Sequence, residues 1–375
     1  MANIVHFGKY YFPDAGGIES VTVSLAKGAA VAGHAVSVVC FEKTPAKSRE
    51  FIDGVHVLRA PIVKLIASQP LGFKYVLLCL SAAKKSEVVH LHAPNMLGAL
   101  CALFLPAKTR LLVHWHSDVV NKGFLGGILR PLESALLRRA DCIVATSQVY
   151  AVASKTLEPF RSKITVVPIG VPDAKHEGYG AQLPPALEAR IGCRKVVLAV
   201  GRLVPYKGFN VLIDAAQHLI EGAVVVIVGG GPLQQDLQQM VEHKGMKDRV
   251  LVVGRLSDAA LHALFEQATL YCLPSTYRAE AFGVVLLEAM AYGLPIVASD
   301  IPGSGVPWVN QHGVSGLNVP VGNPKAFADA CNQILASEEL RSSLSQGARQ
   351  RFLAEFTEEV SVKRMMATYE RLVAA

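Results

Sequence analysis

The chain has 375 residues, of which 51 % are hydrophobic and 18 % are charged, and its formal net charge is +7. This length and composition are those of a globular protein of about two domains, each large enough to bury its own core. The seven cysteines form no Cys-x-x-Cys pair and no His/Cys cluster, which favours a reducing compartment and argues against disulfides and structural zinc.

Short apolar segments alternate with helical stretches over the first half of the chain. Residues 18–32 have apolar side chains at the spacing of one helix face. The predicted strands of this half are 3–7, 35–40, 55–59, 88–92, 110–114, 142–146 and 164–168. Such alternation predicts a parallel sheet with helices on both faces.

The same pattern starts again after a Gly/Pro-rich linker at 178–185. The predicted strands of the second half are 196–200, 224–228, 250–253, 271–274 and 295–299. We therefore expect two doubly wound α/β domains, residues 1–172 and 173–357, followed by a closing helical segment at 358–375. Open sheets of this type bind ligands at the carboxyl ends of their strands, and two facing sheets would enclose a cleft.

Two motifs of the first half stand where ligands are expected. Gly16, Gly17, Ile18 and Glu19 lie between a strand and a helix, where paired glycines let the backbone approach a phosphate, although such a pair alone is usually only a turn. The segment His-Trp-His-Ser-Asp at 114–118 ends an apolar strand. Its polar side chains should face the cleft, so His116 and Asp118 are site candidates, although a histidine at a strand end is more often structural.

In the second half, Gly201, Arg202 and Lys207 follow a strand directly. An arginine and a lysine at a strand end can neutralise a diphosphate leaving group, as Mg²⁺ does in other enzymes, although surface charges on a turn would look the same. The chain contains no Asp-x-Asp motif, and we therefore expect no metal site.

The segment 274–299 is the richest in candidate site residues. Glu280 and Glu288 are eight residues apart, about 12 Å along a helix axis, and Phe282 and Gly283 open a helix between them. Unpaired N–H groups from Gly283, Val284 and Val285 form a diphosphate site at the helix start. Glu280 is suited to accept hydrogen bonds from sugar hydroxyls, and Glu288 to hold the two hydroxyls of a ribose. The alternative interpretation is that Glu280 and Glu288 are ordinary solvent-exposed carboxylates on a helix.

Taken together, these segments resemble the retaining glycosyltransferases of the GT-B type, specifically family GT4, over nearly the whole chain. The strongest part is the Glu-x7-Glu segment from Glu280 to Glu288, continued by Ala-Met-Ala and Gly-Leu-Pro up to Pro295. The stretch 302–308 departs from the family, because it lacks the acidic residue that many members carry there.

The resemblance implies a role for each candidate residue. Arg202 and Lys207 would bind the donor diphosphate, Glu280 the donor sugar and Glu288 the ribose, while His116 would lie beside the transferred sugar. The closing helix, about 358–373, often crosses back to the first domain in this family. The expected catalytic residues are His116, Arg202, Lys207 and Glu280. The expected donor-binding residues are Gly16, Gly17, Gly201, Arg255, Leu256, Phe282, Gly283, Val284, Val285 and Glu288. Glu19 and Asp118 are candidates for acceptor or other contacts.

The implied activity is transfer of a hexose from a nucleoside-diphosphate sugar, with no cofactor and no metal. Segments 6–19 and 303–320 resemble enzymes of bacterial O-antigen and polysaccharide assembly, which favours GDP-mannose or GDP-rhamnose, with UDP-sugars possible. The resemblance, together with the excess of basic residues in the first half of the chain, implies a lipid-linked saccharide acceptor. A sugar-nucleotide epimerase or a phosphorylase on the same fold is the alternative. A dehydrogenase is less favoured, because Gly-Gly-Gly-Pro at 229–232 does not complete Gly-x-Gly-x-x-Gly.

Charge is unevenly distributed along the chain. Residues 1–172 contain 19 Lys and Arg against 10 Asp and Glu, whereas the remainder contains 18 against 20. This basic half suggests an anionic partner such as a phospholipid surface, although a solvated surface is an equal alternative. Segments 62–85 and 121–139 mix apolar and basic residues as a membrane-surface segment or an ordinary packed helix does. The sequence has no stretch in which aromatic and basic residues alternate, and we therefore expect no nucleic-acid partner.

We found no secretion signal at the start of the sequence and no convincing transmembrane helix. The best candidate for a span, 88–107, contains His90, His92 and two prolines. We therefore expect a cytoplasmic protein, with the cytoplasmic face of the inner membrane as a possible site of action.

Overall fold

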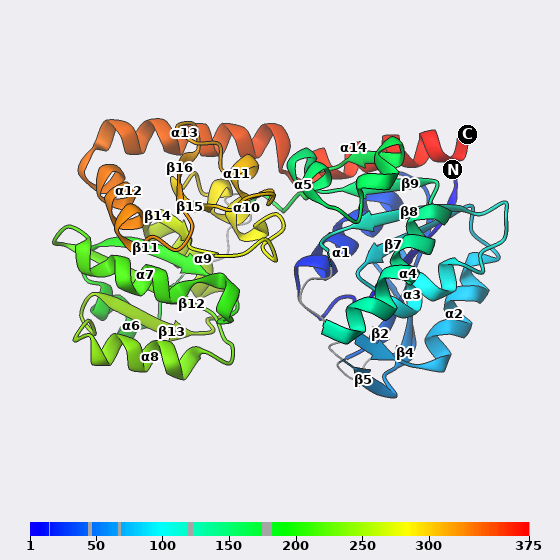
Figure 1. Cartoon of the computed structure of the whole chain (residues 1–375), viewed down its shortest axis with the longest axis horizontal. Helices are drawn as coiled ribbons and strands as arrows, with labels where there is room; N and C mark the ends of the chain where they lie inside the picture. The colour runs from blue at the N-terminus through cyan, green and yellow to red at the C-terminus, as the bar shows by residue number, and fades with distance from the viewer. Residues whose placement is uncertain (15, 44–46, 67–68, 119–122, 175–181, 375) are drawn as a thin grey trace. The chain divides into compact units, whose positions relative to one another are not determined.

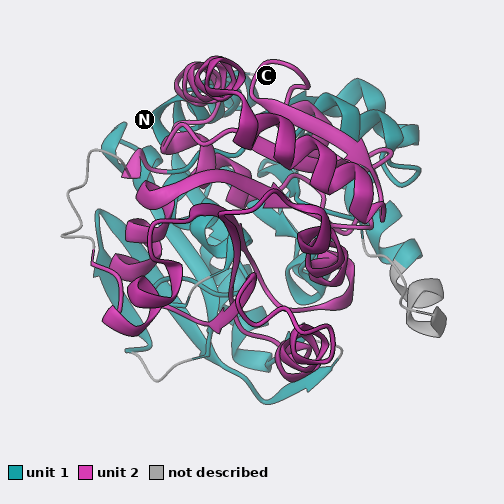
Figure 2. Ribbon diagram, turned by 90° about the vertical axis from the view of Figure 1, so that its left-hand side faces the viewer, with its two compact units in different colours: residues 1–171, 358–375 teal, residues 172–357 magenta. Residues whose placement is uncertain are grey.

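The computed structural model describes residues 1–14, 16–43, 47–66, 69–118, 123–174 and 182–374, and their side chains except those of 123–129 (Figure 1). Residues 178–181 of the predicted linker, and residues 67–68 and 121–122 of the two segments that mix apolar and basic residues, lie outside the described residues. The chain divides into two compact units (Figure 2). Unit 1 comprises residues 1–171 and 358–375, and unit 2 comprises 172–357.

Unit 1 is built on an eight-stranded sheet of order β10-β9-β8-β7-β1-β2-β4-β3. Its strands are β1 (Asn3–Phe7), β2 (Ala35–Glu42), β3 (Arg49–Ile52), β4 (Val55–Pro61), β7 (Val88–Ala93), β8 (Arg110–Trp115), β9 (Cys142–Ala145) and β10 (Ile164–Val166). All neighbouring pairs are parallel except β3 with β4. The predicted parallel sheet is confirmed, and the seven predicted strands lie within two residues of the observed bounds.

The sequence analysis missed three short strands of unit 1. One is β3, which pairs with β4 through the turn at Asp53 and Gly54, both of positive φ. An Asp-Gly dipeptide is a strong hairpin signal and was available in the sequence. The other two, β5 (Lys64–Ile66) and β6 (Gln69–Leu71), form a separate antiparallel pair.

Helices flank the sheet of unit 1. They are α1 (Gly17–Val31), α2 (Phe73–Ala83), α3 (Met96–Ala102), α4 (Gly123–Arg139), α5 (Gln148–Ala153), the 3₁₀ turn η1 (Glu158–Lys163) and α14 (Glu358–Ala374). The last of these, drawn in red in Figure 1, packs against α1 and β7 although it closes the chain. A Cβ atom at Gly28 of α1 would lie 2.5 Å from Val362, so glycine allows this close helix contact. Ser361 also donates a hydrogen bond to the carbonyl of Pro168 at 2.8 Å.

Unit 2 is built on a six-stranded, fully parallel sheet of order β13-β12-β11-β14-β15-β16. Its strands are β11 (Lys195–Val200), β12 (Ala223–Val228), β13 (Val250–Gly254), β14 (Ala268–Leu273), β15 (Ile296–Asp300) and β16 (Gly316–Pro320). Every residue of β12, Ala-Val-Val-Val-Ile-Val, is buried, as expected for a parallel strand covered on both faces.

The helices of unit 2 follow its strands along the chain. They are α6 (Pro185–Ile191), η3 (Pro205–Lys207), α7 (Phe209–Ala215), η4 (Ala216–His218), α8 (Gln234–His243), α9 (Asp258–Gln267), α10 (Val284–Ala291), α11 (Val306–Val309), α12 (Pro324–Ala336) and α13 (Glu338–Glu355). The predicted doubly wound second sheet is thus confirmed. Within the described part of the chain, none of the helices has the length and apolar character needed to cross a bilayer.

Candidate active site

Two loops of unit 2 lie together because the strands before them are neighbours. Strands β11 and β14 pair in parallel, so both carboxyl ends lie at the same edge of the sheet. The backbone N–H of Thr276 donates to the carbonyl of Tyr206 at 2.8 Å. Gly208 has φ 66°, and a Cβ atom there would lie 2.1 Å from the carbonyl oxygen of Pro274. Only glycine permits this close contact between the loops.

A buried ion pair joins the two loops. The ammonium of Lys207 lies 2.5 Å from a carboxylate oxygen of Glu280, and the two residues are only 9 % and 8 % exposed. The hydroxyl of Ser275 donates to the same oxygen at 2.9 Å. Because an ammonium has three N–H donors, this pair leaves Lys207 with donors for a phosphate while it holds the Glu280 carboxylate in place. The fold therefore brings into direct contact two predicted site residues that are 73 positions apart in the sequence.

The backbone at Glu280 is held by the loop that departs from the family pattern. The buried hydroxyl of Ser304 donates to the carbonyl of Glu280 at 2.5 Å, and the N–H of Gly305 donates to the carbonyl of Ala281 at 2.8 Å. Ser304 itself accepts from the N–H of Val306 at 3.1 Å. Sequence reasoning missed Ser304, because a serine between two glycines gives no signal of this contact.

The glycine run at 229–231 brings Gly201 and Arg255 to the same strand end. A Cβ atom at Gly229 would lie 1.9 Å from the carbonyl oxygen of Gly201, and one at Gly230 would lie 2.8 Å from Nε of Arg255. The glycines therefore allow the loops after three strands to pack closely. This packing accounts for the glycine run, which does not complete the Gly-x-Gly-x-x-Gly pattern of dinucleotide-binding proteins. Arg255 is exposed and Leu256 is partly exposed.

Arg202 is the most accessible of the predicted catalytic residues in unit 2. Its side chain is exposed, and within the described ranges it makes no hydrogen bond or ion pair. An exposed guanidinium next to a strand end is available to an anionic ligand, for which its planar set of donors is well suited.

Helix α10 begins as the sequence predicted. Gly283 is its N-cap with φ 81°, no side chain caps the first turn, and Val284 and Val285 open the helix. The uncapped N–H groups of this turn suit an anion. Phe282 is buried and packs on Trp308 and Phe356, with ring centroids 6.2 Å and 6.1 Å away. Its side chain thus fixes the helix start from the core side.

Glu288 lies on α10, partly buried, within reach of the charge of Lys207. Burial raises the pKa of its carboxyl to about 7, and the charge of Lys207 partly opposes that rise. A carboxyl poised near neutrality in a ligand-binding edge of a sheet is typical of functional sites.

The candidates of unit 1 near α1 form a small local group. Gly16 is the N-cap of α1, and a Cβ atom there would lie 2.2 Å from a carboxylate oxygen of Glu19. A Cβ atom at Gly17 would meet nothing within 4 Å. The Glu19 carboxylate therefore covers Gly16, while the backbone at Gly17 stays open to a ligand.

Asp118 is held by three side chains of unit 1. Its carboxylate accepts hydrogen bonds from Nε1 of Trp115 at 3.0 Å and from Ser154 at 2.7 Å, and its N–H donates to the hydroxyl of Tyr150 at 2.6 Å. These contacts fix the chain just after His116, the catalytic candidate of this segment.

His116 belongs to a cluster of five buried histidines. His6 pairs with His90 in the β1–β7 register and His92 with His114 in the β7–β8 register, so the side chains share one face of the sheet. The sequence analysis did not anticipate this cluster, because strand pairing gathers residues that are scattered along the sequence. The signal was a His-x-His pattern repeated in two neighbouring strands.

Three of these rings form a hydrogen-bonded row. Nδ1 of His6 lies 3.0 Å from Nε2 of His92, and Nδ1 of His92 lies 3.1 Å from Nε2 of His116. Burial lowers the pKa of His6 and of His116 to about 3, and that of His92 well below its usual value. These imidazoles are therefore neutral at pH 7.

The other two rings stack on this row and reach α14. His90 stacks on His92 with centroids 4.3 Å apart, and its Nε2 lies 3.3 Å from Nδ1 of His114. The hydroxyl of Tyr369 lies 2.5 Å from Nδ1 of His90 and 3.4 Å from Nε2 of His6. The closing helix thus completes the cluster.

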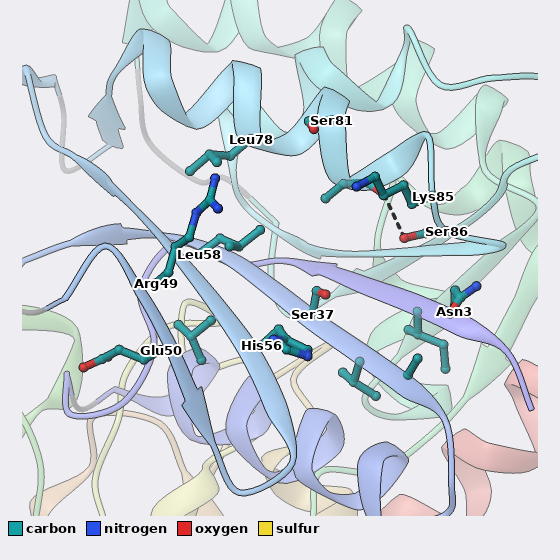
Figure 3. A pocket seen from close by; sticks show the side chains of 15 residues that line it. Asn3, Ser37, Arg49, Glu50, His56, Leu58, Leu78, Ser81, Lys85 and Ser86 are labelled. Atoms are coloured by element: carbon teal, nitrogen blue, oxygen red, sulfur yellow. Dashed lines mark hydrogen bonds between the residues drawn. The ribbon is translucent and has the colours of Figure 1, made fainter.

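Unit 1 also contains a cavity of about 390 Å³ that none of the predicted site residues lines. Figure 3 shows Leu78 and Ser81 on α2, and Lys85 just after its end, facing Ser37 and His56 on the strands. The sequence analysis gave no indication of this cavity.

Comparison with known proteins shows which family the chain resembles. The model "Glycosyl transferase 4-like domain" matches residues 16–170, and "Glycosyl transferases group 1" matches 188–351. The O-antigen chain mannosyltransferase C of Escherichia coli is 30% identical over 373 residues, 99% of this chain and 98% of that protein. The D-rhamnosyltransferase WbpZ of Pseudomonas aeruginosa is 31% identical over 358 residues, 94% and 92% of the two chains. Sucrose-phosphate synthase from Thermosynechococcus elongatus superposes with a TM-score of 0.80 over 100% of both chains, at 23% identity.

Two parallel-sheet α/β units with these structural neighbours define the GT-B fold. The chain belongs to the glycosyltransferase group 1 family, with a GT4-like domain in its first half. The resemblance drawn from the Glu280–Glu288 segment is thereby confirmed, and the protein is a glycosyltransferase.

Proposed function

We propose that this glycosyltransferase moves a hexose from a nucleoside-diphosphate sugar to a hydroxyl of a lipid-linked saccharide during O-antigen-type polysaccharide assembly. The name of one long relative, an O-antigen chain mannosyltransferase, supports the polysaccharide setting. The name of another relative, a GDP-mannose-dependent mannosyltransferase of Mycobacterium tuberculosis, supports a GDP-linked donor, with a UDP-sugar as the alternative. The observation that carries the proposal is the buried Lys207–Glu280 pair beside the start of α10.

Each group of the unit 2 site has a role that follows from its charge and position. Arg202 and Lys207, with the N–H groups of Val284 and Val285, bind the donor diphosphate. Glu280, held by Lys207, accepts hydrogen bonds from hydroxyls of the donor sugar. Glu288 binds the hydroxyls of the ribose. Gly201 lets the backbone approach the phosphates, and Arg255 and Leu256 border the base.

For unit 1 we propose donor contacts by the backbone of Gly16 and Gly17 and by His116. The open space at Gly17 supports a phosphate contact there. Glu19 and Asp118 are proposed to contact the acceptor. Because Asp118 already accepts two hydrogen bonds, it acts mainly by holding the loop that carries it.

The proposed reaction retains the configuration of the anomeric carbon. The bond from that carbon to the diphosphate oxygen breaks, and the diphosphate leaves with the electron pair. The acceptor oxygen forms the new bond on the same face and gives its proton to a phosphate oxygen. Since negative charge grows on the diphosphate, the preorganised cations and N–H donors stabilise the transition state more than the substrate.

Protein cations take the place of a divalent ion in this scheme. Addition of Mg²⁺ or Mn²⁺ to the purified enzyme should therefore leave the transfer rate unchanged. A rate that depends on either ion would contradict this part of the proposal.

A panel of nucleotide sugars tested by calorimetry, followed by product analysis with a saccharide acceptor, tests the function. We expect one GDP-sugar to bind best and nucleoside diphosphate to be released only when acceptor is present. Release without acceptor, or interconversion of the free sugar nucleotide, would instead favour the phosphorylase or the epimerase. An anomeric configuration inverted in the product would contradict retention.

A peripheral membrane contact is proposed for unit 1. Phe73 and Leu77 of α2 are 72 % and 52 % exposed, and Leu65 on β5 is 59 % exposed beside the exposed Lys64 and Lys74. Exposed apolar side chains flanked by lysines suit an anionic lipid surface. This supports action at the cytoplasmic face of the inner membrane.

Cosedimentation with vesicles tests this contact. We expect binding to vesicles that contain phosphatidylglycerol, and loss of binding in Phe73→Ala/Leu77→Ala. Phe51→Ala, at a phenylalanine on β3 that is 66 % exposed, is the matched control and should bind as the wild type does. Equal sedimentation of the wild type and the double variant would contradict the proposal.

A further inference from the structure

We propose that unit 1 binds one transition-metal dication through His92, His114 and His116. One ring nitrogen from each of the three lies within 4.8 Å of one from each of the others, and all three residues are buried. This inference stands on the histidine cluster alone. It shares His116 with the donor contact proposed for unit 1, and it does not depend on the site proposed in unit 2.

The spacing of the nitrogens is close to what coordination needs. A tetrahedral ion with metal–nitrogen bonds of about 2.0–2.1 Å requires ligand nitrogens about 3.3 Å apart. Nδ1 of His92 and Nε2 of His116 are already 3.1 Å apart. The rings of His114 and His116 are stacked, with centroids 4.1 Å apart, so rotation of the His114 ring toward the other two nitrogens completes the set.

One ring nitrogen of the cluster lacks a hydrogen-bond partner within the described part of the chain and marks the place where an ion would bind. Nε2 of His114 is buried and has no hydrogen-bond partner among the described residues. Such atoms are rare in folded proteins and often mark an ion or a water. The other nitrogen of this ring, Nδ1, is taken by His90, so Nε2 is the atom that an ion would bind.

The second candidate trio lacks this feature. His6, His90 and His92 also lie within 4.8 Å of one another, but each of their ring nitrogens already pairs with another ring or with Tyr369. Every ligand atom of an ion there would have to give up a hydrogen bond. An ion at His92, His114 and His116 would displace the one between His92 and His116, but it would also satisfy the free Nε2 of His114. The geometry therefore favours the trio that includes His116.

The remaining histidines act as outer support for this site. Nε2 of His92 is held by His6 at 3.0 Å, and Nδ1 of His114 is held by His90 at 3.3 Å. Metal-binding histidines are usually oriented by a partner on the second nitrogen in this way. Tyr369 links the two outer rings and ties the arrangement to α14.

The ligand set selects the class of ion. Neutral imidazoles suit Zn²⁺, Co²⁺, Ni²⁺ or Cu²⁺, whereas Mg²⁺ and Ca²⁺ prefer oxygen ligands. Three protein nitrogens leave a fourth position of a tetrahedral ion open to water or hydroxide. Of the three ligands, His116 is the most exposed, at 6 %, so the open position lies on its side of the cluster.

Cobalt loading of the full chain tests the site. The protein is treated with a chelator, dialysed against Co²⁺ and then against buffer, and its metal content is measured. We expect about one Co²⁺ per wild-type chain and less than about a tenth as much in His114→Gln. His56→Gln, at an exposed histidine on β4 of the same sheet, is the matched control and should retain about one. A wild type that retains no Co²⁺, or a His114→Gln variant that retains as much, would overturn the proposal.

X-ray absorption at the cobalt edge of the loaded wild type gives a test that needs no folded variant. We expect a four-coordinate ion with three imidazole ligands at about 2.0–2.1 Å. A six-coordinate shell of oxygen atoms would show surface binding and would overturn the proposal.

Discussion

The polar groups of the two units are buried by different means. In unit 2, Lys207 and Glu280 are charged and compensate each other at 2.5 Å. In unit 1, five histidines are buried without a countercharge, because burial keeps their imidazoles neutral. A charged pair can meet a charged ligand directly, whereas a neutral cluster responds to protons and metal ions. The difference separates the site proposed for an anionic substrate from the site proposed for a metal ion.

The largest effect that tests this difference is expected at Lys207. Lys207→Ala should lower kcat/KM by about a hundredfold or more, because about 3 kcal/mol of transition-state stabilisation is lost. The same substitution should also destabilise the fold, because Glu280 loses its partner in the ion pair. Removal of one partner leaves a buried charge and should cost about 3–5 kcal/mol of unfolding free energy.

Lys207→Met combined with Glu280→Gln separates the two effects. This double variant should recover most of the unfolding free energy lost in Lys207→Ala, since it leaves no unpaired charge, but it should not recover transfer. Wild-type turnover in either variant would remove Lys207 from the mechanism.

The histidine cluster should make unit 1 sensitive to acid. The unfolded chain takes up protons on histidine below about pH 6.5, whereas His6 and His116 stay neutral in the folded state down to about pH 3. The unfolded state therefore binds more protons in this window, and stability falls as the pH falls. Each of these two residues should lower the free energy of unfolding by up to about 1.4 kcal/mol for every unit by which the pH falls.

Denaturant unfolding of the metal-free protein at pH 7.5 and pH 5.5 measures this loss. His56→Gln, at an exposed position, should show the same pH dependence as the wild type. Equal stability of the wild type at the two pH values would contradict the burial argument.

A smaller effect is expected at Ser304, which fixes the backbone of Glu280. Ser304→Ala leaves a buried carbonyl without this donor and should cost about 1–3 kcal/mol of unfolding free energy, with a loss of kcat. Ser299 is equally buried but has no partner among the described residues, so Ser299→Ala should cost less. Thermal unfolding and initial rates compare the two, and an equal cost for both would show that the hydrogen bond contributes nothing.

The smallest effect concerns the pH dependence of donor binding. The pKa of Glu288 is raised to about 7, so its carboxylate form is lost below neutral pH. If the ribose requires the carboxylate, donor affinity should fall by up to about tenfold from pH 8 to pH 6. Stability should change in the opposite direction, and the contribution of Glu288 to the free energy of unfolding should rise as the pH falls. The reason is that the folded state holds a proton between about pH 4.5 and pH 7 that the unfolded state has lost.

Calorimetric titration of the donor at several pH values tests the role of Glu288. Glu288→Gln should bind donor weakly and with little pH dependence in this range. A wild-type affinity that stays constant from pH 8 to pH 6 would argue against a ribose contact by the carboxylate.

The sequence predicted the features of the molecule that are local in the chain. Alternating apolar strands and helices identified both sheets, and the turn at Gly283 identified the start of α10. The Lys207–Glu280 contact followed only from the pairing of β11 with β14, which no local pattern specifies. The histidine cluster was missed for the same reason, since His6 and His92 are 86 residues apart and meet only in the folded sheet.

The central claim is that positive groups of the chain bind the diphosphate of the donor. Calorimetry with GDP in the absence of divalent ions tests it most directly, with Arg202→Ala compared against Arg190→Ala on α6. We predict that the wild type and Arg190→Ala bind GDP without added metal, and that Arg202→Ala binds at least about tenfold more weakly. Binding that requires Mg²⁺ or Mn²⁺, or equal affinities in the two variants, would contradict the account.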